Sequence, residues 1–299
     1  MYLSYSGDSL YRQCPRAYYF QYVGKVPLEK PVNRVHMLYG DAVGKIFEQF
    51  YKQKVYLSNS TPRLMAMVEP TLQRIITNET RKGGVFDWAE KGLKPGTRSL
   101  DEVRREVEDT IPRGLTSLRL GGLASNDPWT EVDLTTEQEG HLLAGRADFM
   151  MRRAAQKDLV IVDGKGSRYR GSYTDPRQLR FYAMLHWLRS GTIVDGLGFL
   201  YWRFEPGKNI DWTSVTRQEL EDLRSATLTN IEAIELAVKA VEAKSATFYE
   251  AFAASTGGHC KLCKYASQCP EGTSLLQQNV KGLIADAIAD GVEDGNVSL

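Results

Sequence analysis

Two aspartates and a lysine stand at the ends of two consecutive β-prone segments. The apolar run Leu159–Val162 ends in Asp163-Gly164-Lys165, and because side chains alternate along a strand, Asp163 and Lys165 point to the same side. Asp148 ends the preceding segment, in Gly-Arg-Ala-Asp, and the short connection of residues 152–157 allows a hairpin. This hairpin predicts that Asp148 lies beside Asp163, so that two carboxylates and an ammonium share one cleft.

This trio suits the hydrolysis of a phosphodiester bond. Carboxylates at the ends of adjacent strands are typical ligands of Mg²⁺ or Mn²⁺, which prefer oxygen donors and retain water for chemistry. Such an ion polarises a phosphoryl oxygen, while a nearby lysine stabilises the developing negative charge. A surface Asp–Lys pair at a strand end is the alternative interpretation.

The next helix, predicted over residues 177–190, adds two candidate side chains. Gln178 and Tyr182 stand four residues apart, so they share one helical face close to the strand end. They could contact a phosphate or a base, although a helix packed by its apolar residues explains most of the pattern.

All four cysteines fall into one interpretable pattern. Cys260, Cys263 and Cys269 form C-x2-C-x5-C, and Cys14 is the remaining cysteine. Four thiolates can bind zinc or a [4Fe–4S] cluster, and their spacing does not separate the two. Unrelated buried cysteines are the less favoured alternative.

The surrounding pattern predicts an α/β fold with a central mixed sheet flanked by helices. The sequence predicts helices over residues 6–22, 40–54, 177–190 and 217–245, and strands over 129–135, 141–151, 157–163 and 194–204. We expect one domain over residues 1–275, with a helical insertion over 55–128, cluster-binding segments at 1–39 and 246–275, and a tail over 276–299.

Composition places few limits on function. Lys and Arg total 38 against 37 Asp and Glu, a net charge of +1, so any surface that binds nucleic acid must be local. Candidate contacts to DNA are Tyr18, Tyr19, Arg168, Tyr169 and Arg170. The sequence predicts neither a signal peptide nor a membrane span, so we expect a cytoplasmic protein without a membrane partner.

The order of the motifs resembles that of RecB-like PD-(D/E)XK nucleases. Gly-Arg-Ala-Asp148, Val-Asp163-Gly-Lys165 and Gln178-Leu-Arg-Phe-Tyr182 correspond to motifs two to four of that family, and the segments 3–6 and 14–19 resemble its opening. The family includes the nuclease modules of bacterial helicase–nuclease complexes and CRISPR-associated adaptation exonucleases. The resemblance implies a PD-(D/E)XK restriction-endonuclease-like core.

The same resemblance implies roles for individual residues. Asp148, Asp163 and the carbonyl group of Gly164 would bind the metal, Lys165 would be catalytic, and Gln178 and Tyr182 would support the site. The split of one N-terminal and three C-terminal cysteines resembles the iron–sulfur subset of the family. This favours a structural [4Fe–4S] cluster over zinc.

The sequence departs from the family pattern in the helix predicted over residues 40–54. Many relatives carry a metal-binding histidine in a G-x-x-x-H motif, whereas here Gly40 is followed at that position by Gly44. Glu48 lies one turn later and is a candidate replacement ligand; a solvent-facing glutamate is the alternative.

The leading hypothesis is therefore a Mg²⁺- or Mn²⁺-dependent deoxyribonuclease. We expect an exonuclease that acts on single-stranded or end-containing DNA, with a setting in recombination, repair or a phage genome and with other recombination or repair proteins as possible partners. The alternative is a catalytically weak or inactive module that binds DNA or a partner through a fold held by a cluster or zinc.

Overall fold

The computed structural model divides the chain into two compact units. Unit 1 comprises Met1–Tyr5 and Lys30–Leu228, and unit 2 comprises Ser6–Glu29 and Thr229–Leu299. The residues described are 1–55, 60–90, 99–124, 129–153, 155–171, 174–275 and 277. The predicted tail over 276–299 lies outside the described residues, apart from residue 277.

Unit 1 is built on a five-stranded mixed sheet, as the sequence predicts. Its strand order is β2-β5-β6-β7-β8; β6 runs parallel to β7, and the other neighbours are antiparallel. The strands are β2 Trp129–Asp133, β5 Arg146–Arg152, β6 Leu159–Lys165, β7 Gly196–Tyr201 and β8 Ile210–Thr213. The continuous apolar run in β6 is explained by its central position, with both faces covered.

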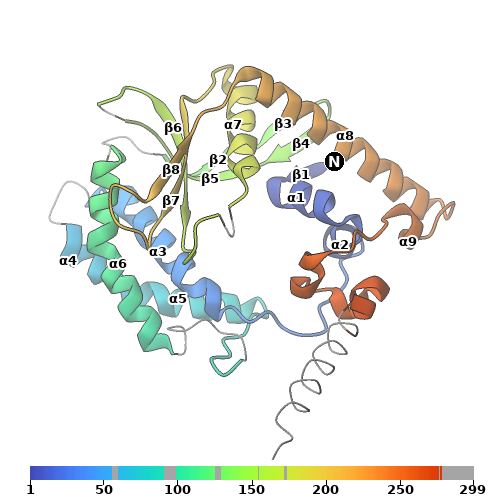
Figure 1. Cartoon of the computed structure of the whole chain (residues 1–299), viewed down its shortest axis with the longest axis horizontal. Coiled ribbons are helices and arrows are strands. Elements are labelled where there is room, and N and C mark those ends of the chain that lie inside the picture. Colours follow the sequence, from blue (N-terminus) through green and yellow to red (C-terminus); the bar gives the residue numbers. More distant parts are fainter. Residues whose placement is uncertain are drawn as a thin grey trace, which may run out of the picture. The chain divides into compact units, whose positions relative to one another are not determined.

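Helices cover the two faces of this sheet (Figure 1). One face packs in a single apolar core with the helices that precede the sheet in sequence, and Phe149 and Val162 point into this core. These helices are α3 Val35–Lys52, α4 Ser60–Met65, α5 Val68–Arg81 and α6 Leu100–Leu120. Helix α7, Pro176–Ser190, contacts β6 and β7. Because Asp163 alternates with Val162 along β6, its side chain faces away from the large core.

The predicted strand over residues 141–151 is in fact two strands in different sheets. β4, His141–Ala144, lies between β1, Tyr2–Ser4, and β3, Thr136–Gln138. The break falls at Gly145, where an added Cβ would come within 2.7 Å of the Leu185 side chain. Glycine at this position lets the backbone approach the side chains of helix α7 closely where the chain passes from one sheet to the other.

The predicted helix over residues 6–22 is interrupted. It consists of α1 Tyr5–Gln13, α2 Pro15–Tyr18 and a π-helical turn, Tyr19–Val23. Cys14 has extended dihedral angles, φ −161° and ψ 105°, because Pro15 disfavours a helical residue before it. The break at Cys14 separates α1 from α2.

Unit 2 joins this N-terminal segment to the C-terminal one. Its parts include the end of α8, Arg217–Glu242, the short α9, Phe248–Ala251, and two 3₁₀ turns, Gly258–Leu262 and Ala266–Gln268. Tyr19 stacks on Phe248 with ring centroids 4.8 Å apart.

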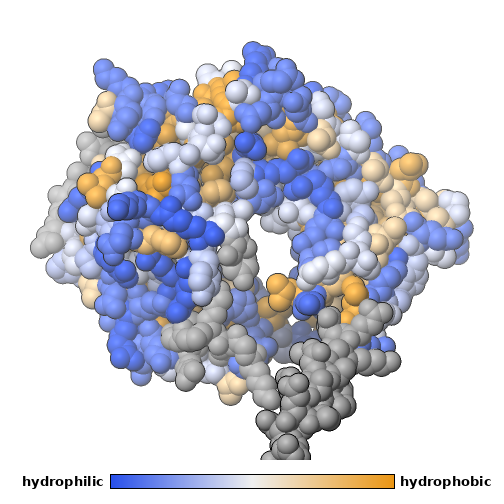
Figure 2. Space-filling view, in the orientation of Figure 1, coloured by the Kyte–Doolittle hydropathy of each residue, from blue (hydrophilic) through white to orange (hydrophobic). Residues whose placement is uncertain are grey.

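Polar residues dominate the exposed surface. Figure 2 shows hydrophilic residues over most of the face in view, with smaller apolar patches between them. Among the described residues, no helix has the length and apolar character needed to span a bilayer.

Candidate active site

The two predicted metal-binding aspartates lie on paired strands. The antiparallel register of β5 and β6 pairs Phe149 with Val162, so the next position brings Asp148 opposite Asp163. The backbone N–H of Gly164 donates to Asp148 Oδ2 at 2.8 Å. Both carboxylates are therefore held at the same end of the hairpin.

Lys165 and Gln178 complete a closed polar network around Asp163. The Lys165 Nζ lies 2.7 Å from Asp163 Oδ2 and donates to Gln178 Oε1 at 2.8 Å. The Gln178 Nε2 donates to Asp163 Oδ1 at 3.1 Å and to the Tyr182 hydroxyl at 3.1 Å. The structure thus brings together Asp148, Asp163, Lys165, Gln178 and Tyr182, and their catalytic roles remain predictions.

Helix α7 is well fixed at its beginning. The Asp175 side chain caps it by accepting from the Arg177 N–H, and Pro176 occupies the first turn. The Tyr5 hydroxyl donates to Asp175 Oδ2 at 2.8 Å. This cap sets the direction in which Gln178 enters the site.

Asp163 is buried and Asp148 is partly buried, and the surroundings of both carboxylates disfavour the charged form. Burial, together with the nearby charge of Asp163, raises the pKa of Asp148 to about 7. Burial also raises the pKa of Asp163, and the adjacent Lys165 ammonium opposes this effect. Burial raises the pKa of Tyr182 to about 12, so its phenol stays neutral. The pair has one lysine for two carboxylates, and a further cation would relieve the repulsion.

The donor set fits Mg²⁺ or Mn²⁺. Asp148 and Asp163 offer hard oxygen ligands, and the carbonyl group of Gly164 is the predicted third. Within the described residues, no three or more His, Cys, Asp or Glu side chains form a group that could hold a metal ion. Coordination by the two aspartates would therefore need backbone and water oxygens as well, as is usual for Mg²⁺.

Glu48, the candidate replacement ligand, is buried rather than solvent-facing, with 7% of its surface exposed. One carboxylate oxygen lies 2.7 Å from the Lys45 Nζ, and the other pairs with Lys52. Burial favours the neutral acid, but the hydrogen bonds from both lysines prevail and lower the pKa of Glu48. At Gly44, an added Cβ would meet nothing within 4 Å. Position 44, where the resemblance implies a histidine, therefore has room for a Cβ.

The four cysteines line a single pocket in unit 2, together with Arg16, His259 and Glu271. Cys14 and Cys260 are buried, and Cys263 and Cys269 are partly exposed. The thiols do not form a group that could hold a metal ion as placed in the described residues. The chain thus gathers the four predicted cysteines around one pocket.

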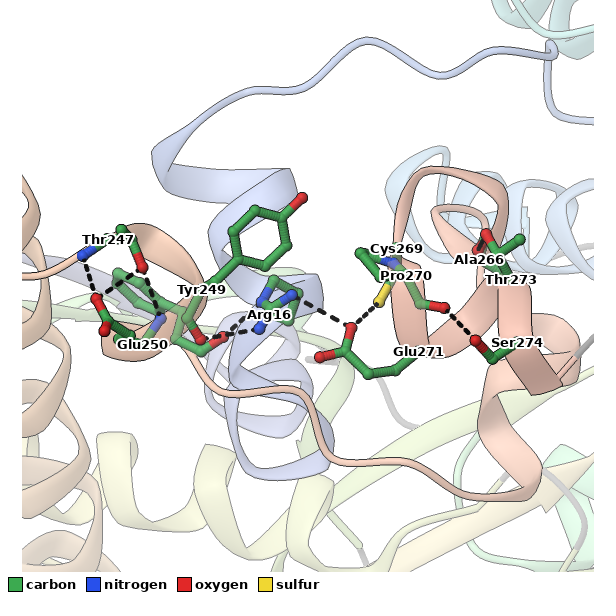
Figure 3. A network of polar contacts seen from close by, with 11 residues as sticks. Arg16, Thr247, Tyr249, Glu250, Ala266, Cys269, Pro270, Glu271, Thr273 and Ser274 are labelled. Carbon is green, nitrogen blue, oxygen red and sulfur yellow. Dashed lines mark hydrogen bonds and ion pairs between the residues drawn. The ribbon is translucent and has the colours of Figure 1, made fainter.

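Arg16, which sequence patterns did not single out, ties this pocket together (Figure 3). Its Nε donates to the Phe252 carbonyl at 2.7 Å, and its Nη2 donates to the Tyr249 carbonyl at 2.9 Å. Its Nη1 lies 3.3 Å from Glu271 Oε2, which also accepts from Cys269 Sγ at 3.3 Å. Its partners lie more than 230 residues away, so no local pattern could reveal them.

The candidate DNA contacts divide into two kinds. Tyr18 is buried and packs against the ring of Tyr11, and Tyr19 stacks on Phe248, so both have structural roles. Tyr169 is 63% exposed, in the loop that follows β6.

The sequence comparison covers almost the whole chain. The sequence matches the PD-(D/E)XK nuclease superfamily over residues 2–270. No curated protein matches the chain.

Two solved structures are similar at low sequence identity. A crystal structure of a candidate exonuclease from Eubacterium rectale is 17% identical, with 80% of this chain and 81% of that chain covered and a TM-score of 0.44. The crystal structure of SSO0001 is 16% identical, with 58% and 76% covered and a TM-score of 0.28. On the sequence match over residues 2–270, this chain belongs to the PD-(D/E)XK nuclease superfamily.

Proposed function

We propose that this chain is a Mg²⁺- or Mn²⁺-dependent deoxyribonuclease with Asp148, Asp163 and Lys165 at its active centre. The observation that carries the proposal is the pair of carboxylates on adjacent strands, Asp163 buried and Asp148 partly buried. Their pKa values are raised, and they lie beside a lysine that two side chains hold in place. Membership of the superfamily supports the same reaction class.

Each side chain has a defined task in this proposal. A bound divalent ion would polarise a phosphoryl oxygen and lower the pKa of a water molecule. Asp148 and Asp163 would bind the ion. The Lys165 Nζ would stabilise the negative charge that develops on the phosphate. Gln178 would hold the lysine in this position through its Oε1, and the Tyr182 hydroxyl would fix the orientation of the Gln178 amide.

The finer proposal is an exonuclease on single-stranded or end-containing DNA, which the motif resemblance implies. The exposed Tyr169 supports contact with unpaired bases, because an aromatic side chain stacks on any base. An inactive binding module is the competing function. It is favoured by Gly44 at the histidine position and by the two lysines that occupy the Glu48 carboxylate.

One assay tests both the nuclease activity and the exonuclease specificity. Purified protein with Mn²⁺ or Mg²⁺ is incubated with labelled linear single-stranded, circular single-stranded and duplex DNA, with Asp163→Ala as the matched control. We expect the wild type to cut linear single strands and spare circles. Cleavage of circles at the same rate contradicts the exonuclease assignment. No cleavage of any substrate favours the binding module.

We also propose that Cys14, Cys260, Cys263 and Cys269 hold a structural [4Fe–4S] cluster, with zinc as the alternative. Their common pocket supports this assignment. Anaerobically purified protein should contain about four irons per chain. Cys14→Ser should lose iron as fully as Cys263→Ser, although the two positions lie far apart in sequence. One stoichiometric zinc in a colourless protein would contradict the cluster and leave the nuclease proposal unaffected.

A further inference from the structure

A second polar cluster surrounds the residue that follows Lys165. The Arg203 Nε donates to the Gly166 carbonyl at 2.8 Å, and the Arg203 guanidinium lies 3.4 Å from the centroid of the Tyr39 ring. An added Cβ at Gly166 would come within 2.7 Å of the Gly40 Cα. Arg203 therefore holds the chain where it leaves the catalytic strand.

One carboxylate serves two arginines in this cluster. Glu106, on α6, accepts from the Arg168 Nη2 at 3.0 Å and from the Arg203 Nη1 through the same oxygen, Oε1. The other oxygen, Oε2, is buried and has no hydrogen-bond partner among the described residues. The arrangement thus lacks the two parallel bonds of a matched arginine–carboxylate pair, and it leaves one positive charge in excess.

The pKa of Tyr39 responds to the same excess of positive charge. Burial raises the pKa of Tyr39, while the charge of Arg203, the hydrogen bond with Thr110 and then the charges of Arg113 and Arg168 act to lower it. Three guanidiniums thus act on one buried ring.

Arg203 and Arg168 differ in how firmly their side chains are held. The Arg203 side chain is 14% exposed and is fixed by the Gly166 carbonyl and the Tyr39 ring. The Arg168 side chain is 29% exposed and has Glu106 as its ion-pair partner among the described residues. Arg168 can therefore exchange its partner for an anion from solution, and Arg203 cannot move far.

We propose that Arg168 and Arg203 bind a backbone phosphate of the DNA next to the bond that is cut, and that Glu106 occupies Arg168 until the phosphate replaces it. Arg168 follows Lys165 by three residues, a span of about 10 Å at most, which keeps the bound phosphate close to the active centre. A guanidinium is well suited to a phosphate because its planar N–H groups match two phosphate oxygens. This inference rests on the proposed nuclease function.

The experiment measures binding without cleavage. Anisotropy of a labelled single-stranded oligonucleotide is recorded in EDTA over a range of KCl concentrations. Arg168→Gln should weaken binding roughly tenfold and reduce the slope of log affinity against log salt by about 0.7, the value for one phosphate on a single strand. Arg168→Lys should retain the slope because it retains the charge.

Two further variants separate a binding site from a structural ion pair. Glu106→Gln removes the competing carboxylate, so it should tighten binding several-fold. Arg104→Gln is the matched control, because Arg104 lies on the same helix as Glu106 and has a carboxylate partner of its own, Glu69 at 2.6 Å, and its loss should leave the slope unchanged. A structural role alone would make Glu106→Gln and Arg168→Gln act in the same direction.

The outcomes are distinguishable. If the wild type binds DNA and Arg168→Gln keeps its slope, or Glu106→Gln weakens binding, the phosphate site is wrong and the nuclease function stands. If the wild type binds no DNA, the proposed function fails and the site fails with it. Circular dichroism of each variant establishes that it is folded.

Discussion

Replacing Asp148 with asparagine should stabilise the metal-free protein at pH 8. In the folded chain, burial and the nearby Asp163 raise the pKa of Asp148 to about 7, from an ordinary value of 3.8. The folded state therefore prefers the protonated acid, and it loses stability as the pH rises from about 4 to about 7. Above pH 7 the whole penalty is present, and asparagine removes it.

The size of the effect follows from the pKa difference. A difference of about 3 pH units corresponds to a ceiling of about 4 kcal/mol. Relaxation around the coupled pair reduces this, so we expect about 1–3 kcal/mol. Asparagine retains a side-chain oxygen that can accept the Gly164 N–H, so the variant should lose no backbone hydrogen bond.

The assay is urea denaturation in EDTA at pH 5 and pH 8. The gain for Asp148→Asn should be smaller at pH 5, where the folded wild type is already protonated. Asp158→Asn is the matched control, because the hydrogen bond from Arg153 lowers the pKa of Asp158, and this variant should lose stability at pH 8. No gain for Asp148→Asn at pH 8, or an equal gain at both pH values, would refute the electrostatic reasoning. Added Mg²⁺ should stabilise the wild type and have little effect on Asp148→Asn.

Three further substitutions test the remaining parts of the site. Lys165→Ala should abolish cleavage and retain DNA binding in EDTA; full cleavage by the folded variant would remove the lysine from the mechanism. If Glu48 exchanges one of its lysine partners for the metal ion, Glu48→Gln should raise the Mg²⁺ concentration needed for half-maximal cleavage several-fold. An unchanged Mg²⁺ titration would show that Glu48 forms only its ion pairs with the lysines. Gly44→His should leave the melting temperature unchanged or raise it, because an added Cβ at position 44 meets nothing within 4 Å and glycine is unfavourable within a helix. A clear drop would show that the rest of the imidazole does not fit.

The parts of the fold that follow from local patterns could be predicted from the sequence. The apolar run before Asp163 identified β6 as a central strand, and the hairpin to Asp148 followed from the short connection. The helix that carries Gln178 and Tyr182 could be predicted equally well, because the spacing of its apolar residues is a local pattern. The resemblance to the PD-(D/E)XK nucleases is confirmed by the match over residues 2–270.

What could not be predicted depends on short elements and on distant partners. β1 and β8 are only three and four residues long, too short for a periodic signal. The two arginines on Glu106 are joined across 62 and 97 positions of sequence, and an arginine alone carries no sign of its partner. The burial of Glu48 was missed because Lys45 and Lys52, about one turn away on either side, give that face of helix α3 a charged pattern.

Manganese binding and cleavage, measured on the same two proteins, test the central claim most directly. Electron paramagnetic resonance counts the Mn²⁺ bound by the wild type and by Asp163→Ala, and labelled single-stranded DNA reports cleavage at the same Mn²⁺ concentrations. We predict that the wild type binds Mn²⁺ and cuts the DNA, and that folded Asp163→Ala does neither. Binding and cleavage at wild-type levels by Asp163→Ala would contradict the claim that the two adjacent aspartates, Asp148 and Asp163, form the metal site of a nuclease.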